Sequence, residues 1–330
     1  MTTDHPLVTV LTPVYNGEKY LAECIESVLA QTYQNWDYTI VNNCSTDRTL
    51  EIAQSYAKND NRIKVVSNSQ FVGVIENHNI AFRLISPSSK YCKVVSADDW
   101  IYPDCIARLV EVAEANPSIG FVGSYILRGG GTEWDVTFDG LPYQSTVISG
   151  RDICRLTLLG GPYVLGIPTS TLYRSDLIRS TDSFYPNLTP YADVSTYFEY
   201  LQTTDFGFVH QVLSFERVHE RSISSSLRMI GTLTPNLLRN ILEYGPVYLT
   251  KHEYEIRLEE LLDNYYRLLA AGFFNLKDKE FWIYHKRTLE ELGHHLYSMR
   301  LAKAICVKLL DLLFNPKQTI EKAIRRLKTD

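Results

Sequence analysis

The first 126 residues alternate between short apolar runs and stretches with apolar positions every three or four residues. Residues 7–12 form an apolar, β-branched run, and the apolar side chains between Leu21 and Leu29 then recur at helical spacing. Further strands are predicted at 38–41, 63–67, 91–96 and 121–127, and further helices at 50–57, 74–84 and 106–113. This alternation predicts an α/β fold with a mostly parallel sheet covered by helices on both faces.

The pattern changes after Arg128. Residues 129–131 predict a flexible joint, and the polar, aromatic stretch 132–150 predicts an irregular loop region. Strands are then predicted at 169–173 and 206–215, a helix at 191–202, and nearly continuous helix from Thr234 onward. These changes divide the chain into three expected regions, 1–128, 129–230 and 231–330.

The composition is that of an ordinary globular protein. Of the 330 residues, 45% are hydrophobic and 22% are charged, which excludes a disordered chain. No apolar run reaches the length of about 18 residues that a membrane-spanning helix needs, and the N-terminal residues lack the pattern of a signal peptide. The six cysteines form no C-x-x-C pair, so we expect reduced thiols. The sequence therefore favours a cytoplasmic protein.

The charge is unevenly distributed along the chain. The formal net charge of −5 argues against nucleic acid as the main partner. Residues 299–330 nevertheless hold eight basic and three acidic residues, with apolar positions at helical spacing both before and after Pro316. In one interpretation this basic amphipathic segment lies on an anionic membrane surface. In the other it is a pair of terminal helices that packs on the domain and keeps its basic face in water.

Polar residues follow several of the predicted strands. Ligands of open α/β sheets bind at the carboxyl ends of the strands. Asp98 and Asp99 follow the strand at 91–96, and two adjacent carboxylates repel one another unless a cation or a ligand compensates. A divalent cation that is also held by substrate phosphates would compensate them. The alternative is an acidic N-terminus for the helix that begins near residue 103.

Five sequence motifs occur in order along the first third of the chain. They are T-P-V-Y-N-G-E-K-Y-L at 12–21, S-V-L-A-Q-T-Y at 27–33, V-N-N-C-S-T-D-R-T at 41–49, G-V-I-E-N-H-N at 73–79 and S-A-D-D-W-I-Y-P-D at 96–104. In order and spacing they resemble the inverting glycosyltransferase family 2. The resemblance is strong over residues 6–125 and weak over 160–225. It implies the Rossmann-like GT-A fold and transfer of one sugar from a nucleotide-sugar, by default a UDP-sugar, to a hydroxyl group.

The resemblance also implies a donor pocket at the ends of the first two strands. Its candidate donor-binding residues are Pro13, Val14, Tyr15, Glu18, Asn43 and Asn77. Asn43 stands where the family has an acid that grips the nucleobase, and an Asn side chain can donate and accept hydrogen bonds but carries no charge. The family's A-R-N segment reads Asn77-His78-Asn79 here, so the usual Arg is absent.

Roles for the acidic motif follow from the same resemblance. Asp98 would contact the ribose side of the donor, and Asp99 would hold Mn²⁺ or Mg²⁺ on the donor diphosphate. His219 lies in a segment similar to the family's R-x-H-x-x-S-x-S ending and is a second candidate metal ligand. Arg217, in the same segment, is a candidate for binding the donor diphosphate.

Inversion by direct displacement needs a carboxylate that takes the proton of the acceptor hydroxyl. Asp193 is the acid that fits the position of the family's base, and Asp182 is the reserve candidate. The alternative for Asp193 is a structural role as a helix cap.

Other enzyme classes lack their sequence signals. Residues 8–20 contain neither the G-x-G-x-x-G of a dehydrogenase nor the Gly-rich phosphate loop of a nucleotidylyltransferase. We therefore expect a nucleotide-sugar half at 1–128, an acceptor half at 129–230 and a helical region at 231–330 that forms a homodimer or docks on the inner membrane face. The expected acceptor is a glycan or a lipid-linked saccharide in cell-surface polysaccharide synthesis. A degenerate member that binds the donor or a partner protein without catalysis is the remaining alternative.

Overall fold

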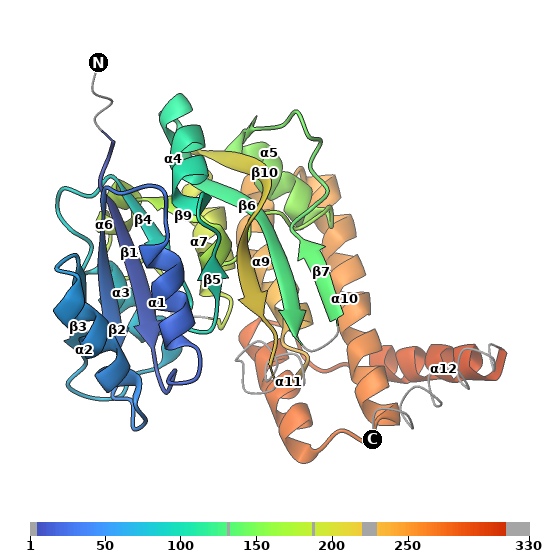
Figure 1. Ribbon diagram of the computed structural model, residues 1–330. Helices are drawn as coiled ribbons and strands as arrows, with labels where there is room; N and C mark the ends of the chain where they lie inside the picture. The colour runs from blue at the N-terminus through green and yellow to red at the C-terminus, as the bar shows by residue number, and fades with distance from the viewer. Residues whose placement is uncertain (1–4, 131–132, 187–188, 220–229, 315–330) are drawn as a thin grey trace. The chain divides into compact units, whose positions relative to one another are not determined.

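The computed structural model describes residues 5–130, 133–186, 189–219 and 230–314. The chain forms two compact units, Met1–His219 and Glu220–Asp330, each of which is described by itself (Figure 1). In the described residues the strands belong to the first unit and the second consists of helices.

Four parallel strands make up one half of the sheet in the first unit. β1 (Val8–Val14) lies between β2 (Trp36–Asn42) and β4 (Tyr91–Val94), and β3 (Ile63–Ser67) pairs with the other edge of β2. The helices between these strands are α1 (Leu21–Leu29), α2 (Thr49–Asn59) and α3 (Val74–Phe82). Nearly every side chain of β1 is buried, which accounts for its continuous apolar run. The predicted alternation of strands and helices is confirmed here.

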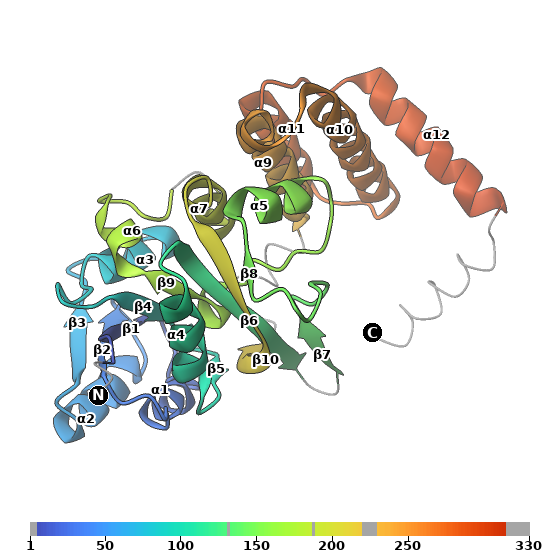
Figure 2. The same ribbon diagram turned by 90° about the horizontal axis from the view of Figure 1, so that it is seen from above.

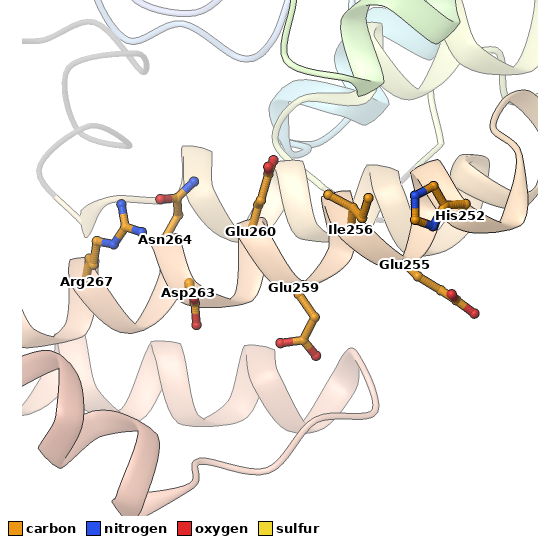
Figure 3. Close-up of a pocket in the computed structure, with 8 residues that line it drawn as sticks. All are labelled: His252, Glu255, Ile256, Glu259, Glu260, Asp263, Asn264 and Arg267. Atoms are coloured by element: carbon orange, nitrogen blue, oxygen red, sulfur yellow. The ribbon is translucent and has the colours of Figure 1, made fainter.

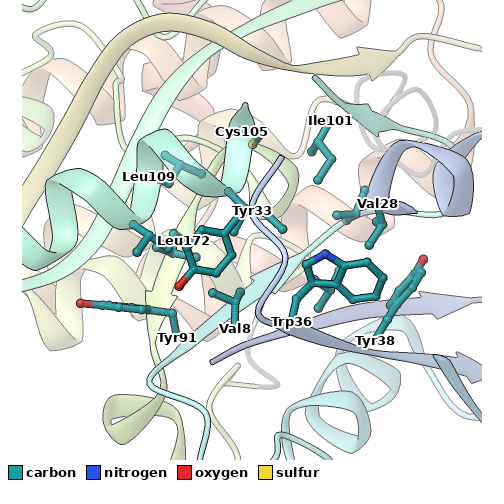
Figure 4. Packing of buried hydrophobic residues seen from close by; sticks show 14 of the residues in the cluster. Val8, Val28, Tyr33, Trp36, Tyr38, Tyr91, Ile101, Cys105, Leu109 and Leu172 are labelled. Atoms are coloured by element: carbon teal, nitrogen blue, oxygen red, sulfur yellow. The ribbon is translucent and has the colours of Figure 1, made fainter. Parts of the chain in front are cut away.

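The hydrophobic core lies between this sheet and the helices on one face. Figure 4 shows Val8, Trp36 and Tyr38 of the sheet gathered with Val28 of α1 and Leu109 of α4 (Cys105–Ala115). Burying one such aliphatic side chain stabilises the fold by about 1.5–3 kcal/mol. Figure 2 shows α1 and α2 on this face, and α3 with α7 (Ala192–Tyr200) on the other.

Beyond β4 the strand pairing becomes mixed. The order across the sheet is β3-β2-β1-β4-β9-β6-β10-β5. β9 (Leu172–Arg174) is antiparallel to β4 and to β6 (Ile119–Gly130), whereas β6 and β10 (Asp205–Arg217) are parallel. The remaining elements of this unit are β5 (Trp100–Ile101), β7 (Glu133–Thr137), β8 (Val147–Ile148), α5 (Gly150–Leu158) and α6 (Ser175–Arg179). The α/β class is confirmed, and the antiparallel additions were not predicted.

Two expectations about the segment after Arg128 are wrong. Gly129 and Gly130 continue β6 instead of forming a joint, and residues 132–150 contain β7 and β8. The ring of Trp134, which pairs with Gly129 across the β6–β7 ladder, comes within 2.8 Å of the place where a Cβ of residue 129 would lie. The glycine therefore makes room for the tryptophan, which is the packing role of glycine within a strand. The strand predicted at 169–173 is divided into a 3₁₀ turn, Pro168–Ser170, and β9.

The second unit contains α9 (Leu233–Tyr248), α10 (Lys251–Phe274), α11 (Lys279–Glu291) and α12 (Ser298–Phe314). Thr250 and Glu253 form a capping box at the start of α10, and Asp278 accepts from the backbone N–H of Phe281 at the start of α11. The expectation of helices from Thr234 onward is confirmed as far as residue 314, and the amphipathic stretch after Pro316 lies outside the described residues. Within those residues, none of the helices has the length and hydropathy to cross a membrane.

Candidate active site

The loops that follow β1 and β2 are tied together by hydrogen bonds. The backbone N–H of Asn16 donates to Ser45 Oγ at 3.0 Å, and the N–H of Gly17 donates to Thr49 Oγ1 at 2.8 Å. Glu18 accepts from the backbone N–H of Arg48 at 3.1 Å. Glu18 therefore holds the two loops together at the outside of the predicted donor pocket.

Asn43 lies buried where these two loops meet. Its side-chain amide donates to the carbonyl of Val72 at 2.8 Å and accepts from the N–H of the same residue at 3.0 Å. The amide of Asn68 then bridges the side-chain oxygens of Asn43 and Asn77, at 3.0 and 2.9 Å. An Asp at position 43 could accept from Val72 N–H but could not donate to its carbonyl, so the backbone geometry accounts for the departure from the family's acid.

The remaining donor-pocket candidates lie at the end of β1. The carbonyl of Val14 accepts from Asn43 N–H at 2.8 Å, which joins this strand end to the amide network. Tyr15 follows it and is half-exposed, with its ring in edge contact with the exposed ring of Phe71 at 4.8 Å. The structure thus brings Pro13, Val14, Tyr15, Asn43 and Asn77 to one end of the parallel strands, as the sequence predicted for their position.

The two adjacent carboxylates lie after β4 in different surroundings. Asp99 is only 4% exposed, and its oxygens accept from Thr169 Oγ1 at 2.6 Å and from the backbone N–H of Arg217 at 2.9 Å. Burial, and then the negative charge of Asp98, raise the pKa of Asp99 well above its usual value. Asp98 is more exposed and lies 3.0 Å from Nε2 of His219. The structure brings together Asp98, Asp99, Arg217 and His219, which are up to 121 residues apart in sequence.

Arg217 contacts the backbone of the acidic pair. Its Nε donates to the backbone carbonyl of Asp98 at 3.1 Å, and its guanidinium forms an ion pair with Glu23 of α1. The guanidinium also lies over the rings of Tyr20 and Trp100, at 4.2 and 5.0 Å from their centroids. The antiparallel pairing of β5 with β10 delivers Arg217 to this place. The guanidinium is therefore engaged within the protein, and its partner Glu23 was not predicted from the sequence.

Asp193 lies in the first turn of α7, two residues after the start of the helix region predicted at 191. Burial raises the pKa of Asp193 to about 6, against the lowering effect of backbone N–H groups at the helix start. Burial, and then the charge of Asp193, raise the pKa of Tyr197, whose hydroxyl donates to Thr171 Oγ1 at 3.0 Å. Thr171 is two residues from Thr169, which bonds Asp99. Helix α7, which carries Asp193 and Tyr197, and the acidic pair therefore both contact the segment from Thr169 to Thr171.

Asp182, the reserve base, lies in different surroundings. It is exposed, and its backbone carbonyl accepts from the guanidinium of Arg83 at 3.0 Å. Between these two acids the geometry favours Asp193.

Lys93 is a buried cation beneath the site that sequence reasoning missed. The Nζ of this fully buried side chain bonds the backbone carbonyls of Val94, Pro168 and Thr171 at 3.2–3.3 Å, and also that of Thr169. Burial lowers the pKa of Lys93 to about 8. Lys93 therefore fastens the 3₁₀ turn to β4 through hydrogen bonds, and this turn carries Thr169, which bonds Asp99. A lysine inside an apolar strand was the sequence signal that could have revealed it.

The acidic pair has the chemistry that Mg²⁺ and Mn²⁺ prefer. A buried carboxylate beside a second carboxylate is destabilised unless a cation approaches, and hard divalent cations take carboxylate oxygens as ligands. Across the described ranges, three or more His, Cys, Asp or Glu side chains do not gather in a way that could hold a metal ion. Further ligands for a cation at Asp99 would have to include the substrate, as is usual for Mg²⁺ held with phosphates.

Comparison with known proteins supports this architecture. The profile of "Glycosyl transferase family 2" matches residues 9–178. The putative teichuronic acid biosynthesis glycosyltransferase TuaG of Bacillus subtilis is 30% identical over 229 residues, which cover 68% of this chain and 84% of that protein. Matches to two other bacterial relatives cover only 37% and 39% of the length of those proteins.

Two solved structures share the fold. TarS 1–349 of S. aureus, in complex with UDP-GlcNAc, aligns with a TM-score of 0.62 over 87% of this chain and 80% of that one, at 18% identity. The mannosyltransferase PcManGT of Pyrobaculum calidifontis, in complex with GDP-Man and Mn²⁺, aligns with a TM-score of 0.55 over 93% and 88%, at 16% identity. The fold is thus that of the GT-A glycosyltransferases. The chain belongs to glycosyltransferase family 2, as its sequence motifs predicted.

Proposed function

We propose that this glycosyltransferase moves a single sugar from a nucleotide-sugar, by default a UDP-sugar, to a hydroxyl of a glycan or lipid-linked acceptor with inversion. The observation that carries the proposal is the segment from Pro168 to Thr171. It bonds Asp99 through Thr169 and reaches the surroundings of Asp193 through Thr171 and Tyr197. This turn thereby contacts the candidate cation-binding acid directly and, through Tyr197, the helix that carries the candidate base.

In the proposed reaction Asp193 takes the proton of the acceptor hydroxyl while that oxygen attacks the anomeric carbon. The bond from the anomeric carbon to the diphosphate breaks at the same time, and the nucleoside diphosphate leaves with the bonding electrons. A base whose pKa is about 6 is mostly ionised at neutral pH and still binds a proton far better than an exposed carboxylate does. One displacement of this kind inverts the configuration of the sugar.

The donor would occupy the ends of β1, β2 and β4. Val14 and Tyr15 would line the nucleobase side, with Asn43 and Asn77 holding the shape of the pocket through their amide network. Asp98 would contact the ribose, and Asp99 with His219 would hold Mn²⁺ or Mg²⁺. Such a cation neutralises the leaving diphosphate when it is bound. The PcManGT structure, which contains Mn²⁺, supports this part of the proposal.

The proposed acceptor belongs to cell-surface polysaccharide synthesis, which the name of TuaG supports. Residues 1–128 would bind the donor and residues 129–230 the acceptor, and the enzyme would work in the cytoplasm or at the inner membrane face. The structure of TarS supports a UDP-sugar, whereas PcManGT carries GDP-Man, so the nucleotide needs a direct test.

The test is hydrolysis and transfer across a panel of UDP-, dTDP- and GDP-sugars, with and without Mn²⁺. We expect Mn²⁺-dependent turnover of one donor and its loss in Asp99→Asn. Asp104→Asn, which changes an exposed acid of the same motif, is the matched control and should keep activity. The anomeric configuration of the product, read by nuclear magnetic resonance, decides between inversion and retention.

A degenerate family member is the second candidate, because Asn43 replaces the family's acid and its amide is engaged by Val72. Such a protein would bind one donor without consuming it. Calorimetric binding of a UDP-sugar together with absent turnover, in the presence of every acceptor fraction tried, would favour this candidate over the transferase.

A further inference from the structure

The outer side of α12 is apolar and uncovered. Met299, Lys303, Cys306, Leu310 and Leu313 recur at three- and four-residue spacing, so they lie along one side of the helix. Met299 is 84% exposed, Leu310 51% and Leu313 70%. With Val307 and Phe314, which flank them and are also exposed, these residues define the outer face of α12.

The opposite side of α12 packs on its own bundle, and this packing determines which way the outer face points. Leu301, Ile305 and Leu312, again at helical spacing, are partly buried, and the helix packs on α10. Arg300 forms an ion pair with Glu259 of α10 at 3.0 Å. Figure 2 shows α12 beside α10, with α9 and α11 on the other side of α10. The packing of the helix therefore leaves the outer face pointing away from its own bundle.

We propose that the outer face of α12 docks on an anionic lipid surface. A helix with this pattern lies in the plane of the interface, with its apolar side chains at the boundary of headgroups and acyl chains. Lys303 lies within the face, where its long side chain can reach the headgroups while its methylene groups stay among the apolar side chains. The sequence after Phe314 adds five basic and two acidic residues, so the charge favours anionic lipid.

Charge also argues against a second copy of the chain as the occupant. Pairing of two outer faces would bring two copies of Lys303 into one apolar interface. Like charges in contact oppose association, whereas anionic headgroups neutralise them. An exposed apolar helix face of this extent signals an interaction surface, and the lipid partner matches both its hydrophobicity and its sign of charge.

The acids along α10 are largely neutralised within the same unit. Figure 3 shows Glu255, Glu259, Glu260 and Asp263 along α10, where they line a groove with His252 and Arg267. Three of these acids, Glu255, Glu259 and Glu260, form ion pairs with Lys251, Arg300 and Arg257. The groove therefore carries little net charge and does not oppose the approach of the outer face of α12 to an anionic lipid surface.

The proposal is tested by sedimenting the full chain with two kinds of vesicle. One kind is phosphatidylcholine alone, and the other is an equimolar mixture of phosphatidylcholine and phosphatidylglycerol. We expect binding to the anionic vesicles that is at least about tenfold stronger and that weakens as salt is added. Equal recovery with both vesicles, or with none, would overturn the proposal.

Two pairs of variants separate the outer face from the rest of the helical unit. Leu310→Glu should weaken vesicle binding by about tenfold or more, whereas Ile283→Glu, which changes a similarly exposed apolar residue of α11, should not. Lys303→Glu should weaken binding about fivefold or more, whereas Lys286→Glu on α11 should not. Circular dichroism of each variant checks the helix content.

Light scattering distinguishes the rival occupant. A dimer that dissociates in Leu310→Glu but persists in Ile283→Glu, with no vesicle binding by the wild type, would assign the face to a second copy and contradict the lipid proposal. The vesicle experiment measures no catalysis. Its failure would therefore leave the proposed transfer reaction standing, and a failure of transfer would leave the lipid proposal standing.

Discussion

The two ends of the candidate site bury their polar side chains in different ways. At the ends of β1 and β2, the neutral amides of Asn43, Asn68 and Asn77 bond one another and the backbone of Val72. After β4, the carboxylate of Asp99 is buried beside that of Asp98, and the groups that it accepts from are a hydroxyl and a backbone N–H. The amide end is electrically neutral, whereas the acidic end keeps negative charge inside the protein.

This difference in buried charge indicates which end of the candidate site needs a charged ligand. A buried amide whose donors and acceptors are paired costs little, and a buried carboxylate without a nearby cation costs much more. The cation Arg217 directs its Nε to the backbone of Asp98 and its guanidinium to Glu23, while Lys93 bonds backbone carbonyls. We therefore predict that positive charge reaches the acidic end together with the substrate, and that changes there have the larger effects.

The largest effect is expected for Asp193→Asn. The amide cannot take the acceptor proton, so kcat should fall by about 10²–10⁴-fold with KM little changed. Steady-state rates on the donor found by the panel measure the loss. Because burial disfavours the charge of Asp193, the variant should also unfold at a higher urea concentration at pH 7. Asp182→Asn is the exposed control, and equal rates for the two variants would refute the base assignment.

Lys93→Met is expected to have the next largest effect, and it acts on the scaffold of the acidic end. Methionine has a similar length but donates nothing, so the carbonyls of Pro168, Thr169 and Thr171 lose their buried donor. We expect the free energy of unfolding to fall by about 2–4 kcal/mol, because the carbonyls left without a buried donor cost more than the relief of the buried charge returns. Lys90→Met, which breaks an exposed ion pair with Glu114, should cost no more than about 1 kcal/mol. Similar losses in both variants would contradict the fastening role.

Lys93 also illustrates what the sequence could and could not predict. The alternating elements, the family and the acids after β4 were readable because each depends on residues close together in sequence. The partners of these acids were not, because Thr169 lies 70 residues from Asp99, and Glu23 lies 194 residues from Arg217. β7 was missed for a different reason. Its apolar alternation consists of only Trp134 and Val136, shortly after three glycines that predict a joint, so this short edge strand gives a weak signal. The roles of the site residues stay predictions.

The pH dependence of catalysis tests the assignment of Asp193 as the base without a substitution. Burial raises the pKa of Asp193 to about 6, and the base acts only when deprotonated. We therefore expect kcat/KM to fall about tenfold per pH unit as the pH drops below 6, and to be level from about 7 upward. The residual rate of Asp193→Asn should lack this step. A wild-type profile that is level down to pH 5 would mean that another group is the base.

The smallest effect is expected at the amide end, where Asn43→Asp moves a charge into the neutral network. The new carboxylate would face the carbonyl of Val72, to which the Asn43 amide donates at 2.8 Å, and it would leave that carbonyl without its donor. We expect the free energy of unfolding to fall by about 1–3 kcal/mol. We also expect the donor nucleotide to bind more weakly. Urea unfolding and calorimetric titration of UDP and GDP measure the two effects.

Asn59→Asp, at the exposed end of α2, is the matched control for the charge change and should alter neither quantity. The opposite result would be tighter nucleotide binding by Asn43→Asp at unchanged stability. The family's acid would then fit this pocket, and the backbone geometry would not explain why Asn stands here. The backbone of Val72 makes the first outcome the expected one, because a carboxylate has no proton to offer its carbonyl.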